Sequence, residues 1–236
     1  MNETIRGLMA RKSVRAYEDR EIPAEVKEAI LLSAVNAPTA GNQQLYTIID
    51  VTDQALKARL ADTCDHQPFI AQGKMVLIFC ADCRKWYDAF RHAGCEPRKP
   101  GPGDLLLAVS DATIAAQNAV AAAESLGVGS CYIGDIMENC GIHRELLHLP
   151  EYVFPCCMLV FGYPTQQQKD RPKPERAAMR HIVHENAYRM MDGASCGNSS
   201  PPRQSPGPMR TGCRPSARGS TTRISQRKCP APSANT

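Results

Sequence analysis

Two guanidinium groups and a hydroxyl group recur at alternate positions near the start of the chain, in Arg11, Ser13 and Arg15. In extended backbone, alternate side chains share one face. Arginine offers planar, paired hydrogen-bond donors that suit a phosphate group. We therefore expect this turn, with Lys12 inside it, to bind a phosphate monoester. A solvated basic turn is the alternative interpretation.

A loop with a different chemistry follows over residues 37–44, between an expected helix and an expected strand. Its proline and glycine restrict the backbone, and Thr39, Asn42 and Gln44 supply hydroxyl and amide groups. Side-chain amides both donate and accept hydrogen bonds, which matches the alternating edge of a flavin or pyrimidine ring. The loop is therefore predicted to bind such an edge, and a polar connecting loop is the alternative.

The third cluster lies where an alanine-rich segment ends. Small side chains recur between Ala115 and Ala123, and glycines follow at positions 127, 129 and 134. Glycine allows the backbone to approach a planar ligand closely. We therefore expect the segment 132–135, Tyr-Ile-Gly-Asp, to lie against such a ligand. A helix C-cap followed by a turn would explain the same glycines.

The elements that must position these clusters follow from the apolar periodicity. Helices are expected over about residues 3–10, 23–37, 53–61, 104–126 and 143–148, strands over 46–51, 74–81 and 153–162, and a short strand or turn over 130–136. The segment 104–126 is apolar nearly all round, which predicts a central, buried helix. Because strands and helices do not alternate strictly, we predict an α+β fold. Its mixed, mainly antiparallel sheet would be flanked by helices around the long central helix.

Composition changes near Met191. Residues 193–236 contain seven basic residues, no acidic residue and almost no large apolar residue. We therefore predict a ligand-binding domain over residues 1–191 and a low-complexity basic tail, disordered, over residues 192–236. Residues 1–192 contain 21 basic and 24 acidic residues, a net charge of about −3. The domain is thus not a general polyanion binder, and no nucleic-acid partner is expected.

The sequence also indicates the cellular compartment of the protein and the oxidation state of its cysteines. No stretch approaches the roughly 18 consecutive apolar residues of a membrane span, and no export signal is visible. We expect a cytoplasmic protein that contacts no membrane. The 11 cysteines are odd in number and irregularly spaced, which favours reduced thiols. Cys80 and Cys83 form a C-x-x-C pair at the end of a strand pattern, not at the start of a helix. We expect ordinary buried thiols and no metal site.

Taken in order, the motifs resemble those of the nitroreductase family. They are the basic Ser-centred turn, the Pro/Gly/Asn/Gln loop, a helix that ends in E-S-L-G-x-G, the triplet Y-I-G and a late basic arm over residues 171–176. The resemblance covers about residues 3–190. It is closest to the branch of oxygen-insensitive NADPH nitroreductases and flavin reductases. It implies an α+β homodimer with two FMN sites at the subunit interface.

The resemblance also implies which residues bind FMN. The basic turn would hold the phosphate together with the late arm. The loop 37–44 would contact the ring edge from the other subunit, and the segment 132–135 would run over the isoalloxazine face. The implied cofactor-binding residues are Arg11, Lys12, Ser13, Arg15, Pro38, Thr39, Asn42, Gln44, Gln67, Tyr132, Ile133, Gly134, Asp135, Lys173 and Arg176.

The implied function is that of an NAD(P)H-dependent flavin oxidoreductase. It would reduce nitro compounds, quinones or other electron-poor small molecules by a ping-pong hydride mechanism, and no side chain stands out as a catalytic acid. Two alternatives stay open: a non-catalytic flavin-binding protein, and another reductase of the superfamily such as a dehalogenase or enone reductase. Two departures from the family pattern bear on substrate and NADPH preference. Asp135 replaces a second glycine, and the low-complexity tail stands where a helical segment is usual.

Overall fold

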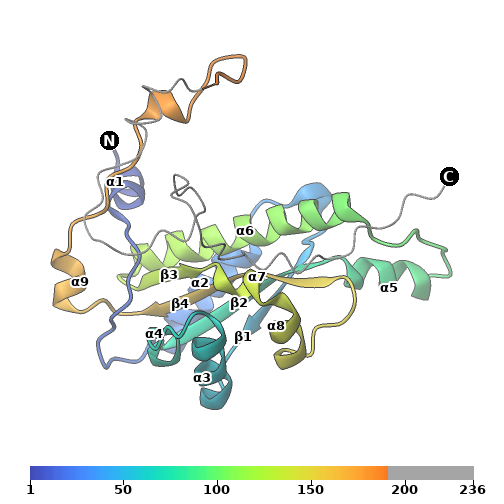
Figure 1. Cartoon of the computed structure of the whole chain (residues 1–236), viewed down its shortest axis with the longest axis horizontal. Helices are drawn as coiled ribbons and strands as arrows, with labels where there is room; N and C mark the ends of the chain where they lie inside the picture. The colour runs from blue at the N-terminus through green and yellow to red at the C-terminus, as the bar shows by residue number, and fades with distance from the viewer. Residues whose placement is uncertain (191–236) are drawn as a thin grey trace, which may run out of the picture. The chain divides into compact units, whose positions relative to one another are not determined.

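The computed structural model describes residues 1–190. Contacts divide the chain into two compact units, Met1–Pro174 and Glu175–Thr236, and the second is described only as far as residue 190. The first unit contains a four-stranded antiparallel sheet in the order β1-β2-β4-β3 (Figure 1). Its strands are β1 (Tyr46–Asp50), β2 (Met75–Asp82), β3 (Gly129–Ile133) and β4 (Val153–Gly162).

Helices make up most of the remaining regular structure, so the predicted α+β class is confirmed. Those of the first unit are α1 (Glu3–Ala10), α2 (Ala24–Val35), α3 (Gln54–Thr63), α4 (Phe69–Gln72), α5 (Arg84–His92), α6 (Pro102–Ser125), α7 (Asp135–Glu138), α8 (Cys140–Leu146) and α9 (Gln166–Asp170), with the 3-10 turn η1 (Ala40–Asn42). The second unit contains the 3-10 turn η2 (Met179–His181).

Both faces of the sheet are covered, which explains the uninterrupted apolar runs in its central strands. Every residue of β2 is buried. On one face, Phe79 and Phe161 pack with residues of α2 and α6. On the other face, Ile78 and Val160 pack with residues of α3, α4 and α7. A strand that is buried on both sides shows no polar alternation, and this is what its sequence displays.

Small side chains allow α6 to lie close to the sheet (Figure 1). Its buried face is built largely from alanines, namely Ala108, Ala112, Ala115, Ala116, Ala119 and Ala123. At its start the Asp104 carboxylate accepts a hydrogen bond from the Gly101 amide at 2.8 Å. The Arg98 guanidinium beside Asp104 lowers the pKa of that carboxyl to about 2. Among the described helices, α6 alone has the length and hydropathy of a membrane span, a test that core helices also pass.

The prediction that α6 is buried all round is wrong for the single chain. Leu105, Leu107 and Ile114 are exposed, and Leu106 is 68% exposed. The nearby helix α1 contacts α6 and has no buried residue. Clustered, exposed large apolar side chains are typical of a surface that another chain covers. The sequence pattern alone cannot distinguish burial inside one chain from burial between two.

A helix that the sequence did not predict, α5, follows β2 directly. It is amphipathic, but its few apolar residues are aromatic and stand among charged ones, so no aliphatic stripe marks it. Cys83 immediately precedes α5, so the C-x-x-C pair does stand at a strand-to-helix junction, contrary to expectation. Both thiols are free and buried, as predicted. No group of residues able to hold a metal ion occurs in residues 1–190.

The chain that follows β4 lies along the N-terminal segment, where Tyr17 and Pro164 form an antiparallel bridge. The Glu18 amide donates to the Tyr163 carbonyl at 2.8 Å. A Cβ atom at Gly162 would lie 2.6 Å from the Tyr17 ring, so the close approach requires glycine. Residues 192–236 lie outside the described residues, so the predicted tail and the domain boundary at residue 191 stay predictions.

Candidate functional site

The basic turn is fixed to the start of β3. The Val14 amide donates to the Ser130 carbonyl at 2.9 Å, and Ser13 forms a parallel bridge with Ser130. Val14 is buried, whereas Arg15 is exposed. A Cβ atom at Gly129 would lie 2.6 Å from Val14 Cγ2, so the glycine that ends the E-S-L-G-x-G motif makes room for this turn.

Unsatisfied donors occur in the basic turn and in two segments that contact it. One guanidinium nitrogen of Arg11, Nη1, is buried and has no hydrogen-bond partner among the described residues. Two further groups are buried without a hydrogen-bond partner among the described residues: the Nε atom of Arg171 and the Ser130 hydroxyl. The other end of the Arg171 guanidinium, Nη2, donates to the Ser13 carbonyl. A buried donor without an acceptor costs about 1–3 kcal/mol. The turn therefore fits an anion that would accept these hydrogen bonds.

Two lysines of the predicted site hold backbone in place. Lys12 Nζ donates to the Lys169 carbonyl at 2.6 Å and also to the Arg171 carbonyl. Lys173 Nζ donates to the Met9 carbonyl. These contacts tie the late arm to the basic turn. Arg176, which the family pattern adds to the phosphate site, lies in the second compact unit, so its contact stays a prediction.

A carboxyl group on α6 lies close to this basic cluster. Burial raises the pKa of Glu124, and the positive charges of Arg11, Lys12 and Lys173 act in the opposite direction. The cluster is thus formed by three segments far apart in the sequence: the turn, the end of α6 and the late arm. Its cationic groups outnumber this one carboxylate, so the cluster keeps a net positive charge that attracts an anion.

The predicted ring-edge loop is held by a carboxylate that the sequence analysis missed. Asp111 on α6 is only 2% exposed. It accepts hydrogen bonds from the Thr39 hydroxyl, from the Ala40 amide at 3.0 Å and from the Leu45 amide at 3.2 Å. Buried carboxylates require such partners. Asp111 is the one acidic residue between Asp104 and Glu124 in this alanine-rich helix, and this was the only sequence signal for its role.

The loop itself has a compact, irregular backbone. Gly41, Asn42 and Gln44 have positive φ angles of 55°, 57° and 45°. The Gln44 amide donates to Thr39 Oγ1 at 2.9 Å, and Gln44 Nε2 donates to Asn42 Oδ1 at 3.0 Å. The side chains of Asn42 and Gln44 are therefore side by side, as contact with one ring edge requires.

The aromatic helix α5 supports this loop. Trp86 Nε1 donates to the Gln43 carbonyl at 2.7 Å, and the Trp86 and Phe90 rings lie 5.8 Å apart. A cavity of about 440 Å³ is lined by Gln43, Leu45 and these two aromatic rings, among other residues. The unpredicted helix thus places aromatic side chains beside the ring-edge loop.

The third cluster also comes together. Gln67 Nε2 donates to Asp135 Oδ2 at 3.0 Å and to the Cys64 carbonyl at 2.8 Å, so Gln67 and Asp135 form one polar pair. Ile133 is buried at the end of β3. Among residues 1–190, apart from its two chain neighbours, no atom lies within 4 Å of the position that a Cβ atom of Gly134 would occupy. The backbone of this segment is therefore open on that side.

The ring of Tyr132 joins this segment to α6. Its hydroxyl lies 3.4 Å from Gln117 Oε1, and burial raises its pKa. Pro38 precedes the ring-edge loop, but no specific contact of its side chain supports a role. The structure thus brings the predicted residues together as three local groups. It adds Asp111 and Arg171, which the sequence analysis did not select.

Comparison with known proteins identifies the family of the chain. The model of the family described as "Nitroreductase family" matches residues 8–163. The chain is 36% identical over 183 residues to the FMN reductase [NAD(P)H] of Bacillus subtilis, covering 77% of this chain and 74% of the relative. It is 34% identical over 193 residues to the oxygen-insensitive NADPH nitroreductase of Salmonella typhimurium, covering 81% and 77%.

Solved structures give the same result. NfrA2 of B. megaterium superimposes with a TM-score of 0.78 at 34% identity, covering 84% of this chain and 79% of that one. The family predicted from the order of the motifs is thereby confirmed, together with its fold. This protein belongs to the nitroreductase family.

Proposed function

We propose that the chain binds FMN through the three residue groups described above and uses it to reduce small electron-poor molecules with NAD(P)H. The chain is an FMN-dependent oxidoreductase that takes electrons from NAD(P)H, as its relatives named FMN reductase and NADPH nitroreductase indicate. The observation that carries the site is the guanidinium nitrogen Nη1 of Arg11, in the basic turn, which is buried and has no hydrogen-bond partner among the described residues. It calls for an anion, and FMN ends in a phosphate.

In this proposal, Arg11, Ser13, Arg15 and Arg171 would hold the phosphate. Charge-assisted hydrogen bonds from arginine suit a phosphate better than those from lysine, because the guanidinium donors are planar and paired. Lys12 and Lys173 contribute positive charge while their ammonium groups hold backbone carbonyls. The late arm therefore helps to position the phosphate site as well as to supply Arg171.

The ring would be held by the other two groups. Asn42 and Gln44 would bind its polar edge, with Pro38 and Thr39 beside them. The open backbone at Gly134 would face the ring, because no side chain fills that space. The Gln67 amide keeps the Asp135 carboxylate hydrogen-bonded, which limits the charge that this residue directs toward the ring. When bound, FMN supplies the hydride chemistry, and the protein supplies position and electrostatics.

We propose that each site combines residues of two chains. Along α6, the loop-holding Asp111 and the phosphate-side Glu124 are 13 residues apart in sequence, or about 20 Å at the helical rise of 1.5 Å per residue. The exposed apolar face of α6, including Leu106 and Ile114, lies on the same helix and would pack against the second copy. Such packing would bring the loop of one chain toward the basic turn of the other.

The acceptor is proposed to be a nitro compound, a quinone or another electron-poor small molecule. The cytoplasmic location, and the lack of a membrane or nucleic-acid partner, remain predictions. A non-catalytic flavin-binding protein and a dehalogenase or enone reductase are the competing functions. No observation in the structure favours either of them over the proposed reaction.

One experiment separates enzyme from binder. The purified, flavin-loaded protein is mixed without oxygen with NADH or NADPH, and the visible flavin absorbance is followed. Loss of the yellow colour, followed by its return when a quinone or nitroaromatic compound is added, is the expected result. A flavin that stays oxidised with both nucleotides would contradict the proposed activity. The ratio of the two bleaching rates gives the nucleotide preference.

A further inference from the structure

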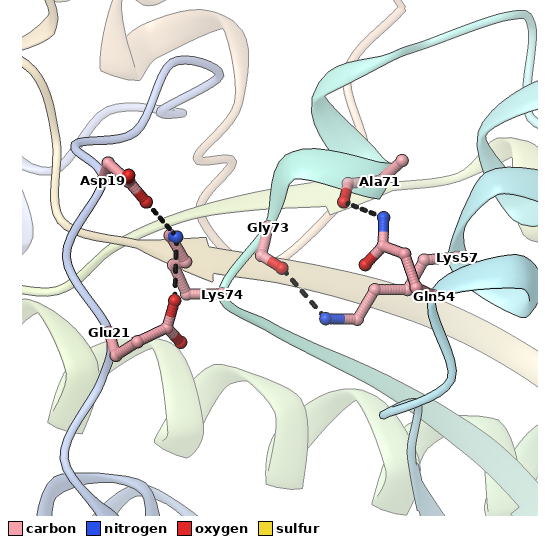
Figure 2. Close-up of polar contacts among 7 residues, drawn as sticks. All are labelled: Asp19, Glu21, Gln54, Lys57, Ala71, Gly73 and Lys74. Carbon is pink, nitrogen blue, oxygen red and sulfur yellow. Dashed lines mark hydrogen bonds and ion pairs between the residues drawn. The ribbon is translucent and has the colours of Figure 1, made fainter.

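A polar cavity of about 490 Å³ lies beside the start of β2, and the proposed FMN site does not use it. Figure 2 shows residues that line it, drawn from three segments: Asp19 and Glu21 near the N-terminus, Lys57 on α3, and Gly73 with Lys74 before β2. Two ammonium groups thus face one open cavity. Their surroundings differ, and this difference decides their chemistry.

The Lys74 ammonium is fully engaged by carboxylates. Its Nζ lies 2.7 Å from Asp19 Oδ1 and 2.8 Å from Glu21 Oε1, and these two hydrogen bonds raise the pKa of Lys74. Lys57 is only 8% exposed, and its Nζ donates to the neutral Gly73 carbonyl at 3.1 Å. Among residues 1–190, no carboxylate forms an ion pair with Lys57.

The charged groups around Lys57 are already paired with one another. Asp50 forms an ion pair with Lys27, and Glu21 forms one with Lys74. Burial is the main cause that lowers the pKa of Lys57. The carboxylates of Asp50 and Glu21 oppose this effect, and the ammonium groups of Lys27 and Lys74 add to it. A lysine in such surroundings is more often neutral at a given pH, and the neutral amine is the nucleophile.

We propose that Lys57 is a site of covalent acylation by small activated acyl compounds that enter this cavity. The neutral Nζ attacks the acyl carbonyl and forms an N–C bond, and the bond to the leaving oxygen breaks with its electron pair. The ammonium proton passes to solvent, so no oxidant or other co-reactant is needed. Acylation removes the positive charge of Lys57 and keeps an N–H group that can still donate to Gly73.

Three lysines of the chain form a matched set for the test. Lys57 combines a lowered pKa with an open cavity. Lys74 lines the same cavity but has a raised pKa. Burial lowers the pKa of Lys85 as well, but its Nζ donates to the Tyr46 carbonyl at 2.7 Å and does not line this cavity.

The folded, flavin-loaded protein is labelled with trace acetic anhydride between pH 6 and pH 10. The extent of labelling at each lysine is then measured by peptide mass spectrometry and divided by the value for the unfolded chain. Lys57 should react faster than Lys74 and Lys85 near neutral pH. Its labelling midpoint should lie at lower pH than that of Lys74, with about a tenfold rate ratio for each pH unit between the midpoints.

The variant Lys74→Gln tests the electrostatic cause. It frees Glu21, whose carboxylate acts on Lys57, and removes the positive charge of Lys74, so Lys57 should become more basic and react more slowly. The variant Lys85→Gln is the control and should leave the labelling of Lys57 unchanged. Labelling of Lys57 no faster than that of Lys74 would overturn the proposal. An unchanged or faster reaction in Lys74→Gln would overturn the electrostatic explanation given for it.

Discussion

Substituting Asp111 by asparagine tests whether this buried carboxylate positions the ring-edge loop. One carboxylate oxygen accepts from the Ala40 amide, and the other accepts from both Thr39 and Leu45. Asparagine keeps one acceptor and turns the other into a donor. The Leu45 amide would then face another N–H group. The Thr39 hydroxyl accepts from the Gln44 backbone amide and has a second lone pair that can accept from the new N–H group. The loss without compensation therefore falls on the Leu45 amide.

The expected loss follows from one hydrogen bond to a charged group, which is worth about 1.5–3 kcal/mol. If this hydrogen bond holds the loop in the geometry that the bound ring needs, its loss lowers flavin affinity roughly 10- to 100-fold. The assay is a fluorescence titration of apoprotein with FMN and with riboflavin. Because the loop is proposed to contact the ring and not the phosphate, both ligands should lose affinity by the same factor.

Asp82→Asn is the matched control. Asp82 is also buried, and it accepts from the Thr47 hydroxyl at 2.6 Å and from the amides of Arg84 and Lys85 at 2.9 and 3.2 Å. Its loss should lower the free energy of unfolding with little effect on the affinity of the folded protein. Wild-type affinity in Asp111→Asn would refute the positioning role, and so would an equal loss in Asp82→Asn.

Three further outcomes are expected. Arg11→Ala should weaken FMN binding about 10- to 100-fold and leave riboflavin affinity nearly unchanged in the same titration; equal losses would remove Arg11 from the phosphate site. Leu106→Glu should shift the protein toward monomers in light scattering. The control Leu32→Glu, which changes an exposed leucine on α2, should alter association less. A fully dimeric Leu106→Glu protein would argue against the α6 interface. Burial lowers the pKa of His143. As pH falls, this histidine therefore binds a proton at a higher pH in the unfolded chain than in the folded protein. Stability should therefore fall as pH drops below the ordinary histidine pKa of about 6.5, and His143→Gln should flatten this dependence in urea unfolding between pH 8 and pH 5.

Local chemistry and periodicity predicted much of the protein. The strands near residues 46, 75 and 153 and the long helix were found because continuous apolar runs and small side chains mark them. The basic turn was identified because Arg11, Ser13 and Arg15 alternate. In the structure, Arg11 Nη1 is buried and has no hydrogen-bond partner among the described residues, and the phosphate site itself stays a prediction.

The features that the sequence did not reveal depend on contacts between distant segments. Asp111 reaches Thr39 across 72 positions, and no local pattern announces such a partner. Arg171 stood in a basic arm with several equivalent cations, so its proximity to Ser13 could not be singled out. Helix α5 was missed because it lacks large aliphatic residues. The exposure of Leu106 was missed because the segment is apolar on nearly every side.

Two properties described above belong to the same helix, α6. Its carboxylate at Asp111 fixes the loop proposed to contact the flavin ring, and its leucines form the face proposed to meet the second chain. The association of two chains and the binding of FMN are then linked equilibria, because any ligand that binds only the associated form also favours association. Adding FMN should lower the concentration at which subunits separate. By reciprocity, concentrated protein should hold FMN more tightly than dilute protein.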